Sequence, residues 1–120
     1  MTYRERAEDL YNMINSGQLL DAFDKYYHND CVMTEATGDR REGKDVNRQY
    51  EEKFLSSVKE FHGAGVGTIN SNEDAKTTSV ESWMDVTFQD GNRMKLEQVA
   101  VQKWDGDHIV DERFYYNAPN

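Results

Sequence analysis

Cysteine, proline and long apolar runs are scarce in this sequence of 120 residues. Cys31 is its one cysteine, so the chain cannot form an internal disulfide. One proline and eight glycines are too few to mark a linker, which favours a single domain over residues 1–120. No apolar run approaches the roughly 20 residues of a membrane span, and the charged start MTYRERAED is unlike a signal peptide. We therefore expect a soluble cytoplasmic domain that has no membrane partner.

Positive charge is scarce as well. Fourteen lysines and arginines stand against 23 aspartates and glutamates, which gives a formal net charge of −9 at pH 7. This field repels phosphate backbones, so we do not expect nucleic acid as a partner. Aromatic residues make up 12% of the chain and recur in periodic segments, which favours a folded domain over a disordered one.

The N-terminal segment has the capping and periodicity of a helix. Thr2 and Glu5 have the spacing of a capping box, in which each side chain accepts a hydrogen bond from a backbone N–H of the other residue. Gly17 supplies a stop, because glycine readily takes a positive φ after a helix. These signals predict a helix over 3–15, followed by a second amphipathic helix over 18–28.

A third helix is predicted over 46–58, with Asp45 as its cap. Its apolar stripe is formed by Val46, Tyr50, Phe54 and Val58. A short strand is predicted before it, at 31–35, because that segment is brief and contains β-branched residues.

After residue 58 the apolar period changes to two, which is typical of strands. Asp-Gly pairs in the intervening turns favour hairpins. The four predicted strands cover 60–70, 76–89, 93–104 and 108–116. Helices followed by a strand meander indicate an α+β fold, in which three helices pack on the concave face of a curved antiparallel or mixed sheet.

Both faces of this sheet carry apolar residues. Val80 and Met84 alternate onto one face, whereas Trp83 lies on the other. Val99 and Val101 likewise lie opposite the apolar even positions of their strand. Helices can cover one face, and the other would expose an apolar patch unless a partner covers it. We therefore expect a homodimer formed through the sheet.

The order of several short motifs resembles one known family. NSGQLLDAFDKYYHNDCVMTEA closes the helical pair, EGKD opens the third helix, and DGDHIVDERFYYN forms the last strand. This arrangement is similar to the SnoaL-like branch of the nuclear-transport-factor-2-like superfamily, which has the ketosteroid-isomerase type of cone. The resemblance implies a curved sheet rolled around helices, one pocket and frequent dimerisation. It does not select a reaction, since members include isomerases, polyketide cyclases, epoxide hydrolases, dehydratases and binding proteins.

Glu35 is the first candidate catalytic residue. It alternates with Cys31 and Met33 onto one strand face, where an apolar environment would raise its pKa and suit it to act as a general base. The resemblance also aligns Glu35 with the aspartate base of the isomerase pattern. The alternative is a solvated carboxylate at the end of a strand. The donor tyrosine of that pattern is not matched, because Leu10 aligns with it and Tyr11 lies one position away.

The remaining candidates each have two interpretations. Trp83 would stack on a ligand and Asp85 would act on it if their face lines the pocket; otherwise Trp83 belongs to the dimer contact. His62 is either a pocket acid or base, or a surface histidine. Gln98 is a pocket amide or a core amide. Other candidate ligand contacts, each of which could be core instead, are Tyr11, Tyr27, Met33, Tyr50 and Tyr116.

The histidines are far apart and lack ligand spacing, so we expect no metal and no cofactor. The resulting hypothesis is a pocket for a small, largely apolar organic ligand. Three functions remain open: cofactor-free isomerase, lyase or cyclase chemistry with Glu35 moving a proton, ligand binding without turnover, and a purely structural dimerisation domain.

Overall fold

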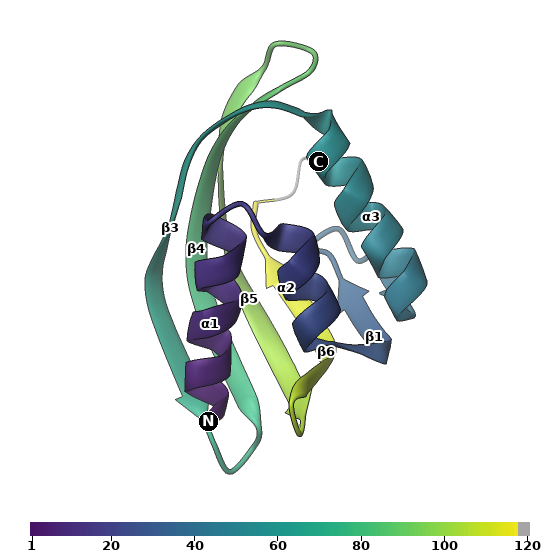
Figure 1. The fold of residues 1–120 in the computed structure, drawn as a ribbon, viewed down its shortest axis with the longest axis vertical. Helices are drawn as coiled ribbons and strands as arrows, with labels where there is room; N and C mark the ends of the chain where they lie inside the picture. The colour runs from purple at the N-terminus through teal and green to yellow at the C-terminus, as the bar shows by residue number, and fades with distance from the viewer. Residues whose placement is uncertain (118–120) are drawn as a thin grey trace.

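The computed structural model describes residues 1–117, which form three helices and a six-stranded sheet (Figure 1). The helices are α1 (Tyr3–Asn15), α2 (Leu19–Tyr26) and α3 (Lys44–Ser57). The strands are β1 (Tyr27–Thr34), β2 (Arg40–Glu42), β3 (Val58–Asn72), β4 (Thr77–Phe88), β5 (Arg93–Asp105) and β6 (His108–Tyr115). The sheet order is β2-β1-β6-β5-β4-β3. All neighbouring pairs are antiparallel except β1 and β6, so the sheet is mixed.

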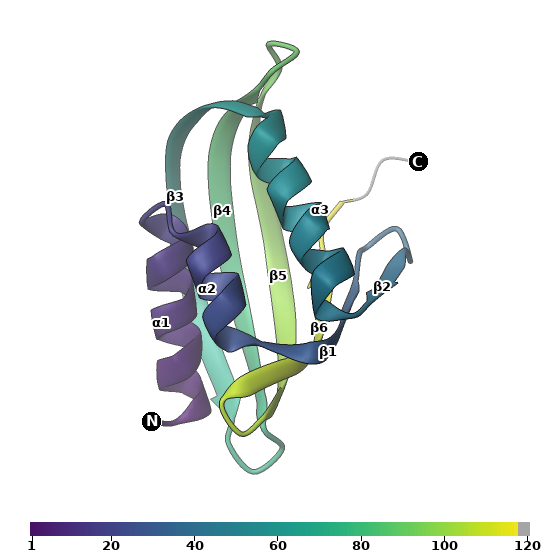
Figure 2. The ribbon, with the colours of Figure 1, turned by 45° about the vertical axis from the view of Figure 1, so that its right-hand side comes forward.

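All three helices lie against one face of the curved sheet (Figure 2). This arrangement confirms the predicted α+β fold with helices on the concave face. The core between the layers contains Leu10 of α1, Phe23 of α2 and Ile109 of β6, all of which are buried. Phe23 also stacks on Tyr27, with ring centroids 4.5 Å apart. Of the helices that the structure describes, none is long and apolar enough to cross a membrane.

The first helix follows the sequence prediction closely. The N–H of Glu5 donates to Thr2 Oγ1 over 3.0 Å, and the N–H of Thr2 donates to Glu5 Oε1 over 2.8 Å, which completes the capping box. Gly17 follows the helix with a φ of +81°. The second helix ends at Tyr26 rather than 28, because Tyr27 already pairs with Ile109 of β6.

The third helix differs from the prediction in its start and in its buried stripe. It begins at Lys44, and its N-cap is Gly43 rather than Asp45. Val46 and Tyr50 are exposed, whereas Asn47 is fully buried. The inward stripe is therefore rotated by one residue, about 100° around the helix axis, from the stripe predicted through Val46.

Four strands agree with their predictions to within a few residues, and two differ more. β1 begins at Tyr27 instead of residue 31, since its parallel partner β6 extends the ladder. The short β2 was not predicted; it pairs with the end of β1, where Met33 lies opposite Arg41. Three residues of mixed charge have too little pattern to indicate a strand.

The register assigns the two faces of the sheet. Thr78, Val80 and Val86 of β4 are buried, so the even positions face the helices. Trp83 lies on the opposite, outer face and leans over its partner Gly65, where an added Cβ would lie 2.6 Å from Trp83 Nε1. Apolar side chains therefore occupy both faces, as the alternation predicts.

Candidate functional site

A cavity of about 540 Å³ lies between the helices and the concave face of the sheet. This volume is within the range of sites that enclose small organic molecules. Most of its wall is apolar and aromatic. The rings that line it include Tyr11, Phe23, Tyr27, Phe54, Phe88 and Phe114.

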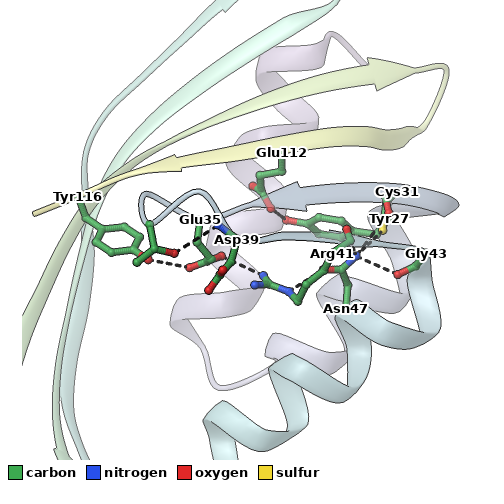
Figure 3. Close-up of polar contacts among 10 residues, drawn as sticks. Tyr27, Cys31, Glu35, Asp39, Arg41, Gly43, Asn47, Glu112 and Tyr116 are labelled. Atoms are coloured by element: carbon green, nitrogen blue, oxygen red, sulfur yellow. Dashed lines mark hydrogen bonds and ion pairs between the residues drawn. The ribbon is translucent and has the colours of Figure 1, made fainter. Parts of the chain in front are cut away.

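Glu112 of β6 contributes a buried carboxyl group to this wall. This residue is 1% exposed, and its carboxyl group accepts a hydrogen bond from Gln102 Nε2 over 2.7 Å. It also accepts one from the hydroxyl of Tyr27 (Figure 3). Burial raises the pKa of Glu112 to about 7, since the hydrogen bonds from Tyr27 and Gln102 only partly offset the loss of solvation. Near neutral pH, this group can therefore both bind and release a proton.

Glu51 of α3 contributes a second acidic group. Burial raises its pKa to about 7, and the charge of Glu112 acts in the same direction, whereas Arg41 opposes it. Within residues 1–117, no protein hydrogen bond engages the carboxyl group of Glu51, although Glu51 lines the cavity. As far as residues 1–117 are concerned, the oxygen atoms of Glu51 are therefore available to a ligand.

Glu35 also lines the cavity, but as one half of an ion pair. Arg41 Nη2 lies 2.9 Å from Glu35 Oε2, and the hydroxyl of Tyr116 donates to Oε1 over 3.0 Å (Figure 3). The hypothesis of a lone carboxylate on an otherwise apolar face is wrong, because β2 brings Arg41 alongside the end of β1. The guanidinium balances the charge of this carboxylate.

Arg41 is held in place by two further contacts. Its Nε donates to Asn47 Oδ1 over 3.1 Å, and its Cζ lies 3.6 Å from the centre of the Tyr50 ring. Asn47 is fully buried and donates in turn to the carbonyl oxygens of Gly43 and Arg41, at 2.9 and 3.1 Å. This network ties the start of α3 to the loop after β1, and thereby fixes the ion pair at the cavity.

The structure gathers most of the predicted ligand contacts at the cavity. The six that line it are Tyr11, Tyr27, Tyr50, Trp83, Gln98 and Tyr116. Burial, and next the charge of Glu112, raise the pKa of Tyr11, so its hydroxyl stays a neutral donor at physiological pH. Trp83 borders the cavity, while its indole lies on the outer face beside Lys95, whose Nζ is 5.0 Å from the ring centre.

Three predicted site residues lie outside the cavity. Met33 packs in the core at 1% exposure. Asp85 accepts two hydrogen bonds from Arg93, at 3.1 and 3.0 Å, on the outer face, and this interaction lowers its pKa. His62 Nε2 lies 2.7 Å from Thr87 Oγ1 on the same side. The odd positions of β4 point away from the helices, which is why Asp85 and its neighbour His62 do not reach the ligand space.

Sequence reasoning did not identify Glu51 or Glu112. Glu51 lies on the same helical stripe as Asn47 and Phe54, four residues after the first and three before the second. The sequence prediction placed the inward stripe through Tyr50 instead, which is exposed. Glu112 alternates with Phe114 on the last strand, so its inward position was readable from the period of two. In the described part of the chain, no group of histidine, cysteine and acidic side chains could hold a metal ion.

Comparison with known proteins gives a family match over almost the whole chain. The family model described as the SnoaL-like domain matches residues 1–116. None of the curated proteins compared with the chain matches it. A solved structure from Mesorhizobium loti, provisionally described as a SnoaL-like polyketide cyclase, is 28% identical and covers 97% of this chain and 100% of its own, with a TM-score of 0.84.

Two further solved structures have the same fold at lower identity. A provisionally described isomerase from Bacillus subtilis has a TM-score of 0.82 at 16% identity, over 98% of this chain and 90% of its own. An LEH-like epoxide hydrolase from M. tuberculosis has a TM-score of 0.77 at 16% identity, over 96% of this chain and 82% of its own. Proteins described by three different reactions thus share this architecture, and the fold does not choose among them.

Proposed function

This chain belongs to the SnoaL-like domain family, and we propose that it binds a small, largely apolar organic molecule in its cavity and moves a proton on that molecule without a cofactor. The observation that carries the proposal is the pair of acids, Glu51 and Glu112, whose pKa values are both raised to about 7 within an aromatic cavity. Acids with such values accept and donate protons readily at physiological pH.

Glu51 is the proposed general base. Its carboxyl group has no hydrogen-bond partner among residues 1–117, so it is free to take a proton from a C–H bond of the ligand. Negative charge then develops on the ligand, and neutral donors on the cavity wall stabilise it. Tyr11 and Gln98 are the donors that we propose, and Tyr27 joins them when Glu112 is protonated, because its single hydroxyl proton otherwise goes to Glu112. Return of the proton to another atom completes an isomerisation, and loss of a leaving group or ring closure completes a lyase or cyclase reaction.

Glu35 has a different proposed role from the base suggested by its place in the chain. Its oxygen atoms are engaged by Arg41 and by Tyr116, which also lines the cavity. We propose that this ion pair orients Tyr116 and Tyr50 toward the ligand, since Arg41 also stacks on the Tyr50 ring. His62, Asp85 and Met33 have no part in this mechanism.

Deuterium exchange tests the catalytic proposal. Ketones and lactones that raise the melting temperature are first selected from an apolar library, and their loss of C–H signal in D2O is then followed by NMR. The wild-type chain is expected to catalyse the exchange, and Glu51→Gln is expected to slow it by about 100-fold or more while thermal stabilisation persists. Glu52→Gln, an exposed neighbour that pairs with Arg48, is the matched control. Equal exchange by Glu51→Gln and Glu52→Gln would reject Glu51 as the base.

Binding without turnover is the second candidate. It is favoured by the hydrogen bonds that already occupy both oxygens of Glu112 and both of Glu35. On this reading, the same ketones stabilise the wild type and Glu51→Gln equally, and neither protein exchanges their C–H protons.

We propose that the outer face of the sheet forms a homodimer interface. Val99 is 36% exposed and Tyr115 is 51% exposed on this face, close to Trp83 in the register. Apolar side chains exposed together on a sheet face are typical of a surface that a second copy covers.

A further inference from the structure

A chain of hydrogen bonds runs through the buried side of the sheet and ends at Glu112. Trp104 Nε1 donates to Thr78 Oγ1 over 2.9 Å, and Thr78 Oγ1 donates to Gln102 Oε1 over 2.7 Å. Gln102 Nε2 then donates to Glu112 Oε2 over 2.7 Å. All of these side chains are almost fully buried, so their polar atoms depend on one another for partners.

The direction of this chain is fixed by the donor and acceptor capacities of its members. An indole N–H can only donate, so Thr78 Oγ1 accepts from Trp104 and its single proton goes to Gln102 Oε1. If the amide turned over, the Thr78 proton would lack an acceptor among the described residues, which is costly for a buried group. Gln102 therefore presents an N–H, and never its oxygen, to Glu112.

We propose that this one-directional chain restricts the proton taken up by Glu112 to Oε1, and that Tyr27 thereby carries protons between Glu112 and a ligand in the cavity. The proposal rests on the proposed function, because it specifies how the more deeply buried of the two acids acts on the ligand. When Glu112 is ionised, Tyr27 donates to Oε1. When Glu112 is protonated, Oε1 donates to the Tyr27 oxygen, and the phenolic proton turns toward a ligand acceptor in the cavity.

The transfer balances in both directions. As a ligand X–H bond breaks, its proton binds the Tyr27 oxygen while the original phenolic proton moves to Glu112 Oε1. The ligand gains one negative charge, and Glu112 loses one. The reverse sequence protonates the ligand. Trp104, Thr78 and Gln102 do not line the cavity, so they are positioning residues that act through Glu112.

Other titratable groups face Glu112 from each packed element. Burial, and to a smaller extent the charges of Glu35 and Asp111, raise its pKa, and Glu112 in turn raises the pKa of groups around it. Those groups are Tyr11 of α1, Tyr27 and Cys31 of β1, and Glu51 of α3. Burial, the hydrogen bonds to Glu112 and the charges of Glu35 and Asp111 set how readily Glu112 takes up a proton, whereas the direction of the hydrogen-bond chain sets which oxygen receives it.

Infrared difference spectra of the ligand-free protein between about pH 5 and about pH 9 test this assignment, because the phenol C–O stretching band of a tyrosine differs between hydrogen-bond donors and acceptors. Glu51→Gln serves as the background so that Glu112 is the acid that titrates near neutrality. Subtracting the Tyr27→Phe spectrum isolates the Tyr27 band. We expect this band to move from the donor to the acceptor position as Glu112 takes up its proton.

Thr78→Val should abolish that movement, because the amide of Gln102 can then turn over and the proton can bind Oε2. Thr77→Val, on the adjacent residue whose side chain points to the opposite face of β4, should preserve it. If Tyr27→Phe does not fold, Glu112→Gln supplies the reference, since its amide holds Tyr27 as an acceptor at every pH. A Tyr27 band that stays fixed over the whole range, or that still moves in Thr78→Val, would overturn the proposal.

These spectra need neither ligand nor turnover. If the deuterium-exchange experiment fails but the Tyr27 band moves with pH, only the catalytic function is rejected. A fixed band with intact exchange by Glu51 would reject the Tyr27 route alone.

Discussion

Arg41 Nη2 and Glu35 Oε2 lie 2.9 Å apart in an ion pair whose side chains are each 13% exposed. The pairing of β1 with β2 sets this contact, since Arg41 lies opposite Met33 and points back toward the residue that follows the strand. The proposed acid–base chemistry is therefore assigned to Glu51 and Glu112, which have no cation bonded to them in the described residues.

Breaking this pair from one side should destabilise the fold. Arg41→Met leaves the Glu35 carboxylate largely buried without its cation, and we expect a loss of about 2–4 kcal/mol in the free energy of unfolding. The double variant Arg41→Met/Glu35→Gln should recover much of that loss, because no uncompensated charge remains. Urea unfolding of the three proteins measures both effects. A double variant as unstable as Arg41→Met would show that the charge of Glu35 is not the cause.

Glu112 should make stability depend on pH. Its pKa is about 7 in the folded chain, whereas the ordinary value, which applies to the unfolded chain, is 4.5. Between these two pH values the folded state therefore binds more protons than the unfolded state. The stabilisation is full below about pH 4.5 and is lost as the pH rises through about 7. Glu112→Gln removes this titration. The free energy of unfolding of the variant minus that of the wild type should therefore be about 2 kcal/mol larger at pH 8 than at pH 5. A difference between the two proteins that is constant with pH would contradict the raised pKa.

Two glycines of β3 should respond differently to alanine. A Cβ at Gly65 would lie 2.6 Å from Trp83 Nε1, whereas a Cβ at Gly63 would lie 3.5 Å from the same indole, in ordinary contact. Gly65→Ala should therefore cost about 1–3 kcal/mol by displacing the ring, and Gly63→Ala should cost much less. Thermal or urea unfolding distinguishes them. Equal stabilities would show that the indole does not pack over Gly65.

The proposed dimer predicts a change of mass on substitution of the outer face. Val99→Asp places a charge among Trp83 and Tyr115, and we expect it to yield monomers by light scattering. Leu55→Asp is the control, since Leu55 is 40% exposed on α3, away from the sheet. A wild-type monomer, or a Val99→Asp protein that remains dimeric, would reject this interface.

The helices and long strands were predictable because their signals are local. The capping box of Thr2 and Glu5 and the period of two in β4 depend on residues close in sequence, and both occur as predicted. The start of β1 was not predictable, because its first residue is fixed by parallel pairing with Ile109, more than 80 residues later in the chain. Propensity alone carries no information about such a partner.

The candidate site was predictable in its wall but not in its acids. Tyr27, Gln98 and Tyr116 were candidates for either the pocket or the core, and all three line the cavity. Glu35 was expected to be alone, but its environment depends on Arg41 from a three-residue strand that has no sequence signature. Glu51 was missed because a one-residue error in the stripe of α3 rotates every side chain by about 100°.

The most direct test of the account is an NMR titration of the protein labelled with ¹³C at the glutamate side-chain carboxyls. Two resonances should titrate near pH 7, one disappearing in Glu51→Gln and the other in Glu112→Gln. If every glutamate in the chain instead titrated near the ordinary pKa of 4.5, the cavity would hold no acid poised for proton transfer, and the proposed chemistry would be contradicted.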